Sequence, residues 1–178
     1  MSKLLIVVDM QNDFIDGALG TPEAQSIVNP VKDFIDLFDG DVWLTQDTHT
    51  KDYLNTQEGK MLPVEHCITG THGWEINPII QSAFDAKWDD HEVPSYAYEK
   101  PTFGSMALAV MLWNHADYQE IHFVGLCTGI CVISNAVLAK AALPEAKIYI
   151  HKDLCACVTP ESHERALESM RTLQMLVV

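Results

Sequence analysis

The 178-residue sequence predicts an α/β fold in which a mainly parallel sheet lies between two layers of helices. Short apolar runs rich in β-branched residues alternate with longer runs of helical periodicity along the whole chain. Two of the helical runs begin with Thr-Pro-Glu, which is a favourable helix N-terminus. No repeat, low-complexity segment or linker interrupts this alternation. We therefore expect a single doubly wound domain over residues 1–178, with about six strands and helices on both faces.

Each expected element follows from its local pattern. The first expected strand, residues 3–9, is apolar up to a final carboxylate, as is typical of a strand buried on both faces. The other expected strands are residues 41–46, 94–99, 120–124, 146–150 and 173–178. Helical spacing of apolar residues predicts helices at residues 21–39, 74–84, 106–113 and 133–142, and another that begins at Thr159. We expect residues 10–17 to form a loop.

The charge and the N-terminal sequence exclude several classes of protein. A net charge of −14 at pH 7 argues against a nucleic-acid or anionic-membrane surface, because both need a basic surface. The apolar run at residues 4–8 is too short to span a bilayer, and Asp9 and Asp13 break any signal-peptide pattern. These features lead us to expect a cytoplasmic protein.

The five cysteines are expected to be free thiols in a reducing compartment, since their number is odd and the chain is rich in apolar residues. Cys155 and Cys157 are separated by one residue, so on a strand they share a face. We interpret this pair as core packing rather than as a metal site.

Three chemically useful side chains follow three different expected strands: Asp9, Lys100 and Cys131. The carboxyl ends of parallel strands meet at one edge of the sheet, so we expect these side chains to converge. Cys131 lies at a strand–helix junction, where backbone N–H groups and the helix dipole favour a thiolate. A carboxylate can take the thiol proton, and an ammonium group stabilises both anions. Taken singly, each has a structural explanation: a capping or turn aspartate, a solvated surface lysine, which is the more common case for Lys100 alone, and a small buried cysteine. The joint occurrence of all three at strand ends carries the functional interpretation.

Residues 47–73 lose all periodicity, and a long irregular segment in a compact domain is usually functional. Asp47 and His49 are two apart, and Glu58 and His66 follow in the same segment. Such a mixed oxygen and nitrogen set suits zinc, manganese or iron. The remaining histidines are interpreted as polar surface: His72, His91, His115, His122, His151 and His163.

Five segments of the chain together resemble a known family. They read VVDMQNDF, TQDTH, LPVEHCITGTHG, YEKPTFGS and GLCTGICV, in that order. From Lys3 to about Cys155 the chain resembles the isochorismatase-like cysteine hydrolases, and within them the nicotinamidases. Several sister amidases of this family bind no metal ion. The Asp-x-His pair, Asp47 and His49, and the segment around His66 match the metal-binding positions of the nicotinamidases and therefore narrow the resemblance to them.

The resemblance implies a Rossmann-like three-layer fold and a role for each matching residue. Cys131 matches the nucleophile, Asp9 the general base and acid, and Lys100 the residue that orients and polarises. The backbone N–H groups of Cys127 and Cys131 match an oxyanion hole, and the bond between Leu126 and Cys127 matches a cis peptide.

Further residues match the binding positions of the family. Asp47, His49 and His66 match ligands of one divalent metal ion, and Glu58 matches a carboxylate found in only part of the family. The implied ion is zinc, with manganese or iron as alternatives. Phe14 and Phe103 match the walls of an aromatic pocket. The resemblance also implies a homo-oligomer, with no nucleic-acid or membrane partner.

The implied reaction is the deamidation of nicotinamide to nicotinate and ammonia through a cysteine thioester, a step of NAD salvage. The small-molecule amide presents a carbonyl carbon to the cysteine and a pyridine nitrogen to the metal, whose role is then orientation rather than water activation. Two departures bear on the substrate: Gly129 replaces an aspartate common in relatives, and one extra residue lies between Pro63 and His66.

Four other readings remain open. One is a sister amidase that acts on a carbamoyl compound or another small amide. The second is hydrolysis by metal-activated water with Cys131 as a bystander, and the third is a metal-binding or redox-sensing module without activity. An isochorismate vinyl-ether hydrolase is disfavoured, because relatives with that activity generally lack the nucleophilic cysteine.

Overall fold

A computed structural model describes residues 2–90, 96–114 and 117–178 and contains a six-stranded, wholly parallel sheet. The strand order is β3-β2-β1-β4-β5-β6. The strands are β1 (Ser2–Val8), β2 (Asp41–Asp47), β3 (Ala97–Lys100), β4 (Tyr118–Leu126), β5 (Lys147–Ala156) and β6 (Leu176–Val177). The prediction of a doubly wound α/β fold is confirmed.

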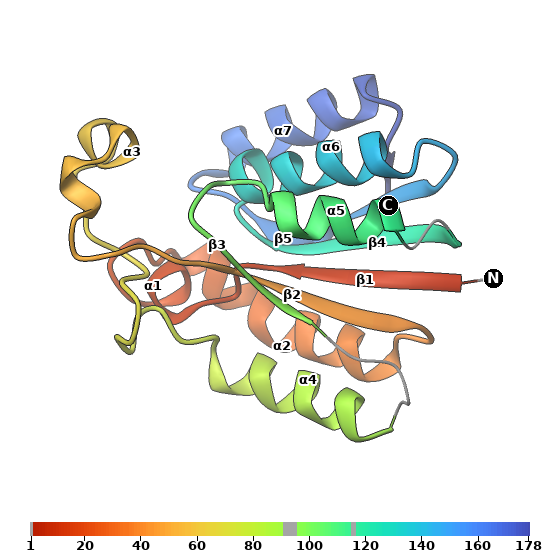
Figure 1. The fold of residues 1–178 in the computed structure, drawn as a ribbon, viewed down its shortest axis with the longest axis horizontal. Coiled ribbons are helices and arrows are strands. Elements are labelled where there is room, and N and C mark those ends of the chain that lie inside the picture. Colours follow the sequence, from red (N-terminus) through yellow and green to blue (C-terminus); the bar gives the residue numbers. More distant parts are fainter. Residues whose placement is uncertain (1, 91–95, 115–116) are drawn as a thin grey trace.

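The α-helices are α1 (Asn12–Ile15), α2 (Pro22–Leu37), α3 (Gln57–Met61), α4 (Pro78–Asp90), α5 (Met106–Asn114), α6 (Ile133–Ala142) and α7 (Pro160–Thr172). A 3-10 turn, η1 (Tyr53–Asn55), and a π-helical turn, η2 (Thr128–Val132), complete the list. The helices form two layers: α2 and α4 cover one face of the sheet, and α5, α6 and α7 cover the other (Figure 1).

Alternate side chains of β1 supply the two cores between these layers. Leu4, Ile6 and Val8 pack toward α5, α6 and α7, whereas Leu5 and Val7 pack toward α2 and α4. All five side chains are buried, which explains why the run is continuously apolar. The chain therefore fixes β1 at the centre of the molecule, with its carboxyl end beside those of β2 and β4.

The helix caps lie where the sequence places them. The Thr21 hydroxyl accepts a hydrogen bond from the backbone N–H of Ala24, and Thr159 forms a capping box with Ser162. Helix α6 has the predicted bounds, 133–142. Among the described helices, none combines the length and the apolar character needed to cross a bilayer.

Several predicted bounds are wrong. The helix expected at 74–84 begins only at Pro78, because Trp74 and Glu75 are held in turns by hydrogen bonds to Thr71 and His72. Part of the loop expected at 10–17 is the short helix α1. Strand β5 continues to Ala156, six residues beyond its predicted end at Ile150. The first residues of the strand expected at 94–99 lie outside the described part of the chain, and β3 begins at Ala97.

Candidate active site and metal centre

Asp9, Lys100 and Cys131 meet at the carboxyl edge of the sheet. Asp9 follows β1 and has a positive φ of 48°, Lys100 is the last residue of β3, and Cys131 lies in the turn before α6. The Lys100 Nζ atom lies 2.7 Å from Oδ2 of Asp9 and 3.6 Å from the Cys131 sulfur. All three residues are buried, with exposed fractions of 0%, 1% and 5%. The sequence prediction that they converge thus holds in the geometry.

The electrostatics of the group depend on the buried ammonium of Lys100. Burial lowers the pKa of Lys100, but the surrounding anions outweigh this and raise it above its usual value. For Asp9, burial raises the carboxyl pKa more than the Lys100 charge lowers it. The hydroxyl of Thr45 donates a 2.6 Å hydrogen bond to Oδ1 of Asp9. A carboxylate with a raised pKa beside a fixed cation is suited to accept and return a proton.

Cys131 differs from the prediction in its resting state. Burial, followed by the charge of Asp9, raises the pKa of the Cys131 thiol well above its usual value, despite the opposing charge of Lys100. Burial and the Asp9 charge thus favour the neutral thiol, whereas the strand–helix junction by itself was expected to favour the thiolate. A thiol in this position needs a base to act as a nucleophile, and Asp9 is in contact to provide one.

The turn that carries Cys131 is held by residues that the sequence analysis missed. The Leu126–Cys127 peptide bond is cis, as the resemblance implied. The amide of Asn135 donates 2.8 Å to the Cys131 carbonyl and accepts 2.9 Å from the N–H of Ser105, so it joins the turn to the segment beside Phe103. Asn135 is a fully buried amide on the face of α6 whose other buried residues are Ala136 and Ala139, and a polar residue in that apolar stripe was the available signal.

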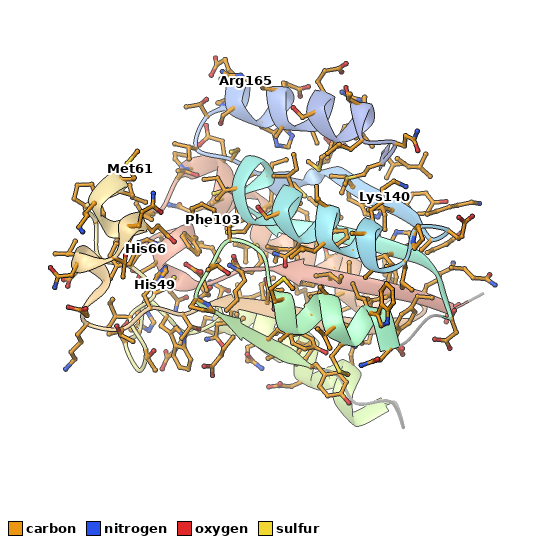
Figure 2. All side chains as sticks on the ribbon, turned by 45° about the horizontal axis from the view of Figure 1, so that its top comes forward. His49, Met61, His66, Phe103, Lys140 and Arg165 are labelled. Atoms are coloured by element: carbon orange, nitrogen blue, oxygen red, sulfur yellow. The ribbon has the colours of Figure 1, made fainter. Side chains whose placement is uncertain are left out.

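Asp47, His49 and His66 form a buried cluster beside these residues. One potential ligand atom from each lies within 4.8 Å of the others. Oδ2 of Asp47 is 3.0 Å from Nε2 of His49 and 3.6 Å from Nε2 of His66. Figure 2 places both histidines at the same end of the molecule as Phe103.

The cluster fits a divalent metal ion. The Nε2 atom of His49 is buried and has no hydrogen-bond partner among the described residues. The Nδ1 atom of His66 lies 2.8 Å from the Val64 carbonyl, which fixes the ring so that Nε2 faces the cluster. One carboxylate and two imidazoles, with a position left open, suit zinc, manganese or iron. The Oε1 atom of Glu58 lies 3.6 Å from Nε2 of His49, but Glu58 is not part of the cluster of three.

Lys100 and Gln11 connect the two clusters. Lys100 Nζ lies 3.1 Å from Oδ1 of Asp47, so one cation contacts both Asp9 and Asp47. Burial raises the pKa of Asp47, but the His49 ring and the Lys100 charge outweigh it and bring the pKa below its usual value. The Gln11 amide accepts from the N–H of Asp47 at 2.7 Å and donates to its carbonyl at 2.8 Å. Gln11 lies inside the DMQNDF segment, but its side chain was given no role there.

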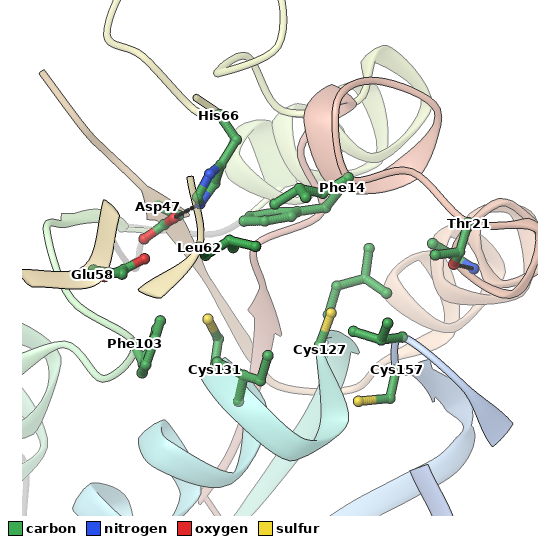
Figure 3. Close-up of a pocket in the computed structure, with 15 residues that line it drawn as sticks. Phe14, Thr21, Asp47, Glu58, Leu62, His66, Phe103, Cys127, Cys131 and Cys157 are labelled. Atoms are coloured by element: carbon green, nitrogen blue, oxygen red, sulfur yellow. Dashed lines mark hydrogen bonds and ion pairs between the residues drawn. The ribbon is translucent and has the colours of Figure 1, made fainter. Parts of the chain in front are cut away.

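A cavity of about 260 Å³ is lined by Cys131 of the catalytic candidates and by Asp47 and His66 of the candidate metal cluster. Its walls include Phe14, Phe103 and Leu62, and its polar end carries Asp47, His66 and Glu58. In Figure 3 the sulfur of Cys131 points toward Phe14 and the Asp47–His66 pair. A flat, apolar molecule with one polar end fits such a cavity, because the aromatic rings cover its faces and the polar residues meet its edge.

The remaining histidines are not all surface residues. The side chain of His72 is 80% exposed, as expected. His122 and His151 instead form a partly buried pair, with 2.9 Å between Nδ1 of His122 and Nε2 of His151. His163 is bound to the buried Thr128, at 2.8 Å. His91 and His115 lie outside the described residues.

A parallel sheet of this order, with a cysteine, an aspartate and a lysine at its carboxyl edge, defines a class of hydrolase. The family model described as Isochorismatase domain matches residues 3–178, and the chain belongs to this family. The chain is similar to an uncharacterized isochorismatase family protein, PncA, of Bacillus subtilis, at 32% identity over 177 residues, which cover 94% of this chain and 93% of that protein.

Two solved structures are also similar. The nicotinamidase/pyrazinamidase PncA of Bacillus subtilis superposes with a TM-score of 0.80 at 31% identity, over 100% of both chains. The pyrazinamidase of Pyrococcus horikoshii in complex with zinc superposes with a TM-score of 0.79 at 26% identity, over 100% of this chain and 99% of that one.

Proposed function

We propose that this protein hydrolyses nicotinamide to nicotinate and ammonia through a thioester on Cys131. The observation that carries the proposal is the position of Lys100, whose Nζ lies 2.7 Å from Asp9, 3.1 Å from Asp47 and 3.6 Å from Cys131. A single buried residue thus contacts the proposed acid–base group, the thiol and one carboxylate of the candidate metal cluster, and both Cys131 and Asp47 line the cavity. The names of the similar proteins, a nicotinamidase/pyrazinamidase and a zinc-bound pyrazinamidase, support this substrate class.

The proposed reaction begins at the resting thiol of Cys131. Asp9 takes the thiol proton, and the sulfur attacks the amide carbon. Lys100 remains charged and stabilises the carboxylate and the developing thiolate. The backbone N–H groups of Cys127 and Cys131 hold the negative oxygen of the tetrahedral intermediate. Asp9 returns its proton to the departing ammonia and then activates a water that hydrolyses the thioester.

Binding is proposed to follow from the two ends of the cavity. Phe14 and Phe103 cover the faces of the pyridine ring. Asp47, His49 and His66, with Glu58 nearby, would hold one divalent ion, zinc in the first place and manganese or iron as alternatives. That ion would supply a Lewis-acid contact to the ring nitrogen and so align the amide with Cys131.

The test is ammonia release from nicotinamide by the wild-type chain and by Cys131→Ala, with metal content measured on the same samples. Cys155→Ala is the matched control, since Cys155 is an equally buried cysteine in the apolar core. The proposal requires that Cys131→Ala abolish turnover and that Cys155→Ala retain it. Equal rates for wild type and Cys131→Ala would contradict it and favour hydrolysis by a metal-activated water.

The second candidate is hydrolysis of another small amide or a carbamoyl compound by the same residues. It is favoured by the cavity, whose walls extend past Cys131 to Leu19, Thr21 and Val158, beyond what a single ring needs. A substrate panel decides between the two. Turnover of another amide or carbamoyl compound, with none of nicotinamide or pyrazinamide, would establish the second candidate.

The setting of the enzyme belongs to the same proposal. All five cysteines are free thiols in the structure, which supports a reducing, cytoplasmic compartment. Nicotinamide hydrolysis there would serve NAD salvage. We also propose one domain over residues 1–178 that assembles as a homo-oligomer.

A further inference from the structure

We infer that Cys157 is a peroxide-reactive thiol and that Cys127 is the partner with which it forms a reversible disulfide. Both residues line the candidate active-site cavity, yet the proposed hydrolysis uses neither sulfur. In Figure 3 they lie at the end of the cavity opposite Glu58. Cys157 is as buried as Cys155, as expected from the sequence, but it also lines this cavity, whereas Cys155 packs in the apolar cluster around α6 and α7.

The register of the sheet brings the two cysteines together. Leu126 at the end of β4 pairs with Ala156 at the end of β5, so Cys127 and Cys157 directly follow the ends of two neighbouring parallel strands, and their side chains are in hydrogen-bond contact. Neighbouring strands run about 4.8 Å apart, and disulfides join Cα atoms that are about 4.4–6.8 Å apart. Because both side chains face the same cavity, a bond between the sulfurs needs side-chain rotation rather than refolding.

The surroundings of Cys157 favour the thiolate, the form that reacts with peroxide. A hydrogen bond from the Cys127 thiol, outweighing the opposing effect of burial, lowers the pKa of Cys157 to about 5, with help from the Ser162 hydroxyl and the N–H groups of Gly129 and Val158. Cys127 itself is held as a thiol, because donating that hydrogen bond and its burial raise its pKa well above the usual value. These contacts favour the thiolate at Cys157 and the protonated thiol at Cys127.

The absence of a side chain at Gly129 leaves the sulfur of Cys157 accessible to a small molecule. A Cβ atom at this position would lie 3.5 Å from the sulfur of Cys157 and 3.3 Å from Cβ of Ala166, so any side chain here is directed at the thiolate. Cys157 also borders two surface hollows, one with Arg165 and Ser169 and the other with Glu23 and His163. A molecule as small as hydrogen peroxide can thus reach it from the cavity or from the surface.

The reaction balances with hydrogen peroxide as the oxidant. The Cys157 thiolate attacks one oxygen, an S–O bond forms, the O–O bond breaks, and hydroxide leaves to take a proton from solvent. The Cys127 sulfur then attacks the sulfur of the sulfenic acid; the S–S bond forms, the S–O bond breaks, and the departing hydroxide takes the Cys127 proton. Two thiols are oxidised to a disulfide, and the peroxide is reduced to two waters.

The test uses mass spectrometry of the full-length chain, so its outcome does not depend on any amidase activity. The background variant is Cys131→Ala, which removes the third cysteine of the cavity. With one equivalent of peroxide we expect the loss of two hydrogen atoms, a cross-link between the peptides of Cys127 and Cys157, and full reversal by dithiothreitol. Adding Cys157→Ser or Cys127→Ser should abolish the cross-link, and adding Cys155→Ser should leave it.

A second measurement covers the case in which a serine variant does not fold. Gly129→Asp and Gly129→Asn place side chains of equal size against Cys157, but only the aspartate adds a negative charge. We expect Gly129→Asp to slow iodoacetamide labelling of Cys157 at pH 6.5 at least 10-fold relative to Gly129→Asn. Equal labelling of the two variants, a cross-link to Cys155, or over-oxidation of Cys157 without any cross-link would overturn the inference.

Discussion

The hydroxyl of Thr128 and the Nδ1 atom of His163 share a hydrogen bond of 2.8 Å, which ties the turn carrying Cys131 to helix α7. Thr128 is fully buried and follows directly on Cys127, whose N–H is proposed to bind the oxyanion. Helix α7 packs against this turn through Ala166, whose Cβ faces Gly129. The orientation of the N–H groups in the proposed oxyanion hole therefore depends on His163, which lies 35 positions away in the sequence.

Thr128→Val should lower kcat with little change in KM, because it removes that hydrogen bond while keeping the shape of the side chain. An unpaired buried group costs about 1–3 kcal/mol, which corresponds to a loss of about 5- to 160-fold in kcat if the cost falls on the transition state. Thr128→Ser keeps the hydroxyl and should recover most of the rate. Steady-state kinetics of the three proteins on the amide that the wild type hydrolyses give kcat and KM. An unchanged kcat in Thr128→Val would show that the Thr128–His163 hydrogen bond does not support the oxyanion hole.

Asp9→Asn should abolish amide hydrolysis, with a loss of about 100- to 10,000-fold in kcat, since the Cys131 thiol would have no base. Because the change also removes a buried counterion of Lys100, the melting temperature should fall as well, so turnover is compared at a temperature at which circular dichroism shows both proteins folded. The control is Asp16→Asn, an exposed carboxylate in the same segment. Retention of turnover by Asp9→Asn would show that a group other than Asp9 accepts the proton of the Cys131 thiol.

Metal removal should distinguish orientation from water activation. Benzamide carries the same amide as nicotinamide on a ring without nitrogen. If the ion only positions the ring, chelation should slow nicotinamide turnover by about 100-fold and leave any benzamide turnover unchanged. Elemental analysis before and after treatment, and on His66→Ala, should show about one ion per chain falling to none. Equal loss of both activities would instead assign the ion to the chemical step.

The His122–His151 pair should make the fold sensitive to acid. Burial and the neighbouring His122 lower the pKa of His151 to about 4, against 6.5 in an unfolded chain. Between these values the unfolded chain binds more protons, so the free energy of unfolding falls as the pH drops from about 6.5 to 4 and levels off below. Allowing for partial exposure, the loss should be about 1–2 kcal/mol.

Urea unfolding at pH 7 and pH 4.5 measures this effect. His151→Gln should reduce the difference between the free energies of unfolding at the two pH values. The control His72→Gln, in an exposed position, should leave that difference unchanged. An identical pH dependence in His151→Gln and wild type would exclude the pair as a source of acid sensitivity.

Gly125→Ala should be among the most destabilising single changes in the chain. Gly125 has φ of 109°, and a Cβ atom there would lie 2.2 Å from the Val8 carbonyl oxygen of β1. We expect a loss of about 3 kcal/mol or more. Gly70→Ala is the matched control, with φ of 78° but open space around the added atom, and should cost only about 1–2 kcal/mol. The midpoints of urea unfolding compare the two variants directly.

The fold was predictable because its signals are local. The buried run of β1 and the caps Thr21 and Thr159 depend only on neighbouring residues, and each lies where the sequence indicated. The end of β5 was not predictable from its own residues. His151 and Lys152 interrupt the apolar run, but the N–H of Lys152 donates a hydrogen bond to the Val178 carbonyl, and pairing with β4 resumes at Cys155 and Ala156.

The candidate site was partly predictable for the same reason. Parallel strands carry residues such as Asp9 and Lys100 to one edge whatever the details of packing. The state of Cys131 was not predictable, because the pKa of its thiol depends on burial and on Asp9, which are set by the whole fold. Contacts such as that between Thr128 and His163 join distant segments and leave no pattern in the sequence.

Because Lys100 is the shared counterion of Asp9 and Asp47, the two clusters cannot change independently. Loss of Asp47 would leave Lys100 with Asp9 as its carboxylate partner and would lower the pKa of Asp9, since the Asp47 charge raises it and the Lys100 charge lowers it. We therefore expect any substitution of the proposed metal ligand Asp47 to alter the proposed proton acceptor Asp9 as well, so that a second change beside Lys100 is needed to restore its pKa.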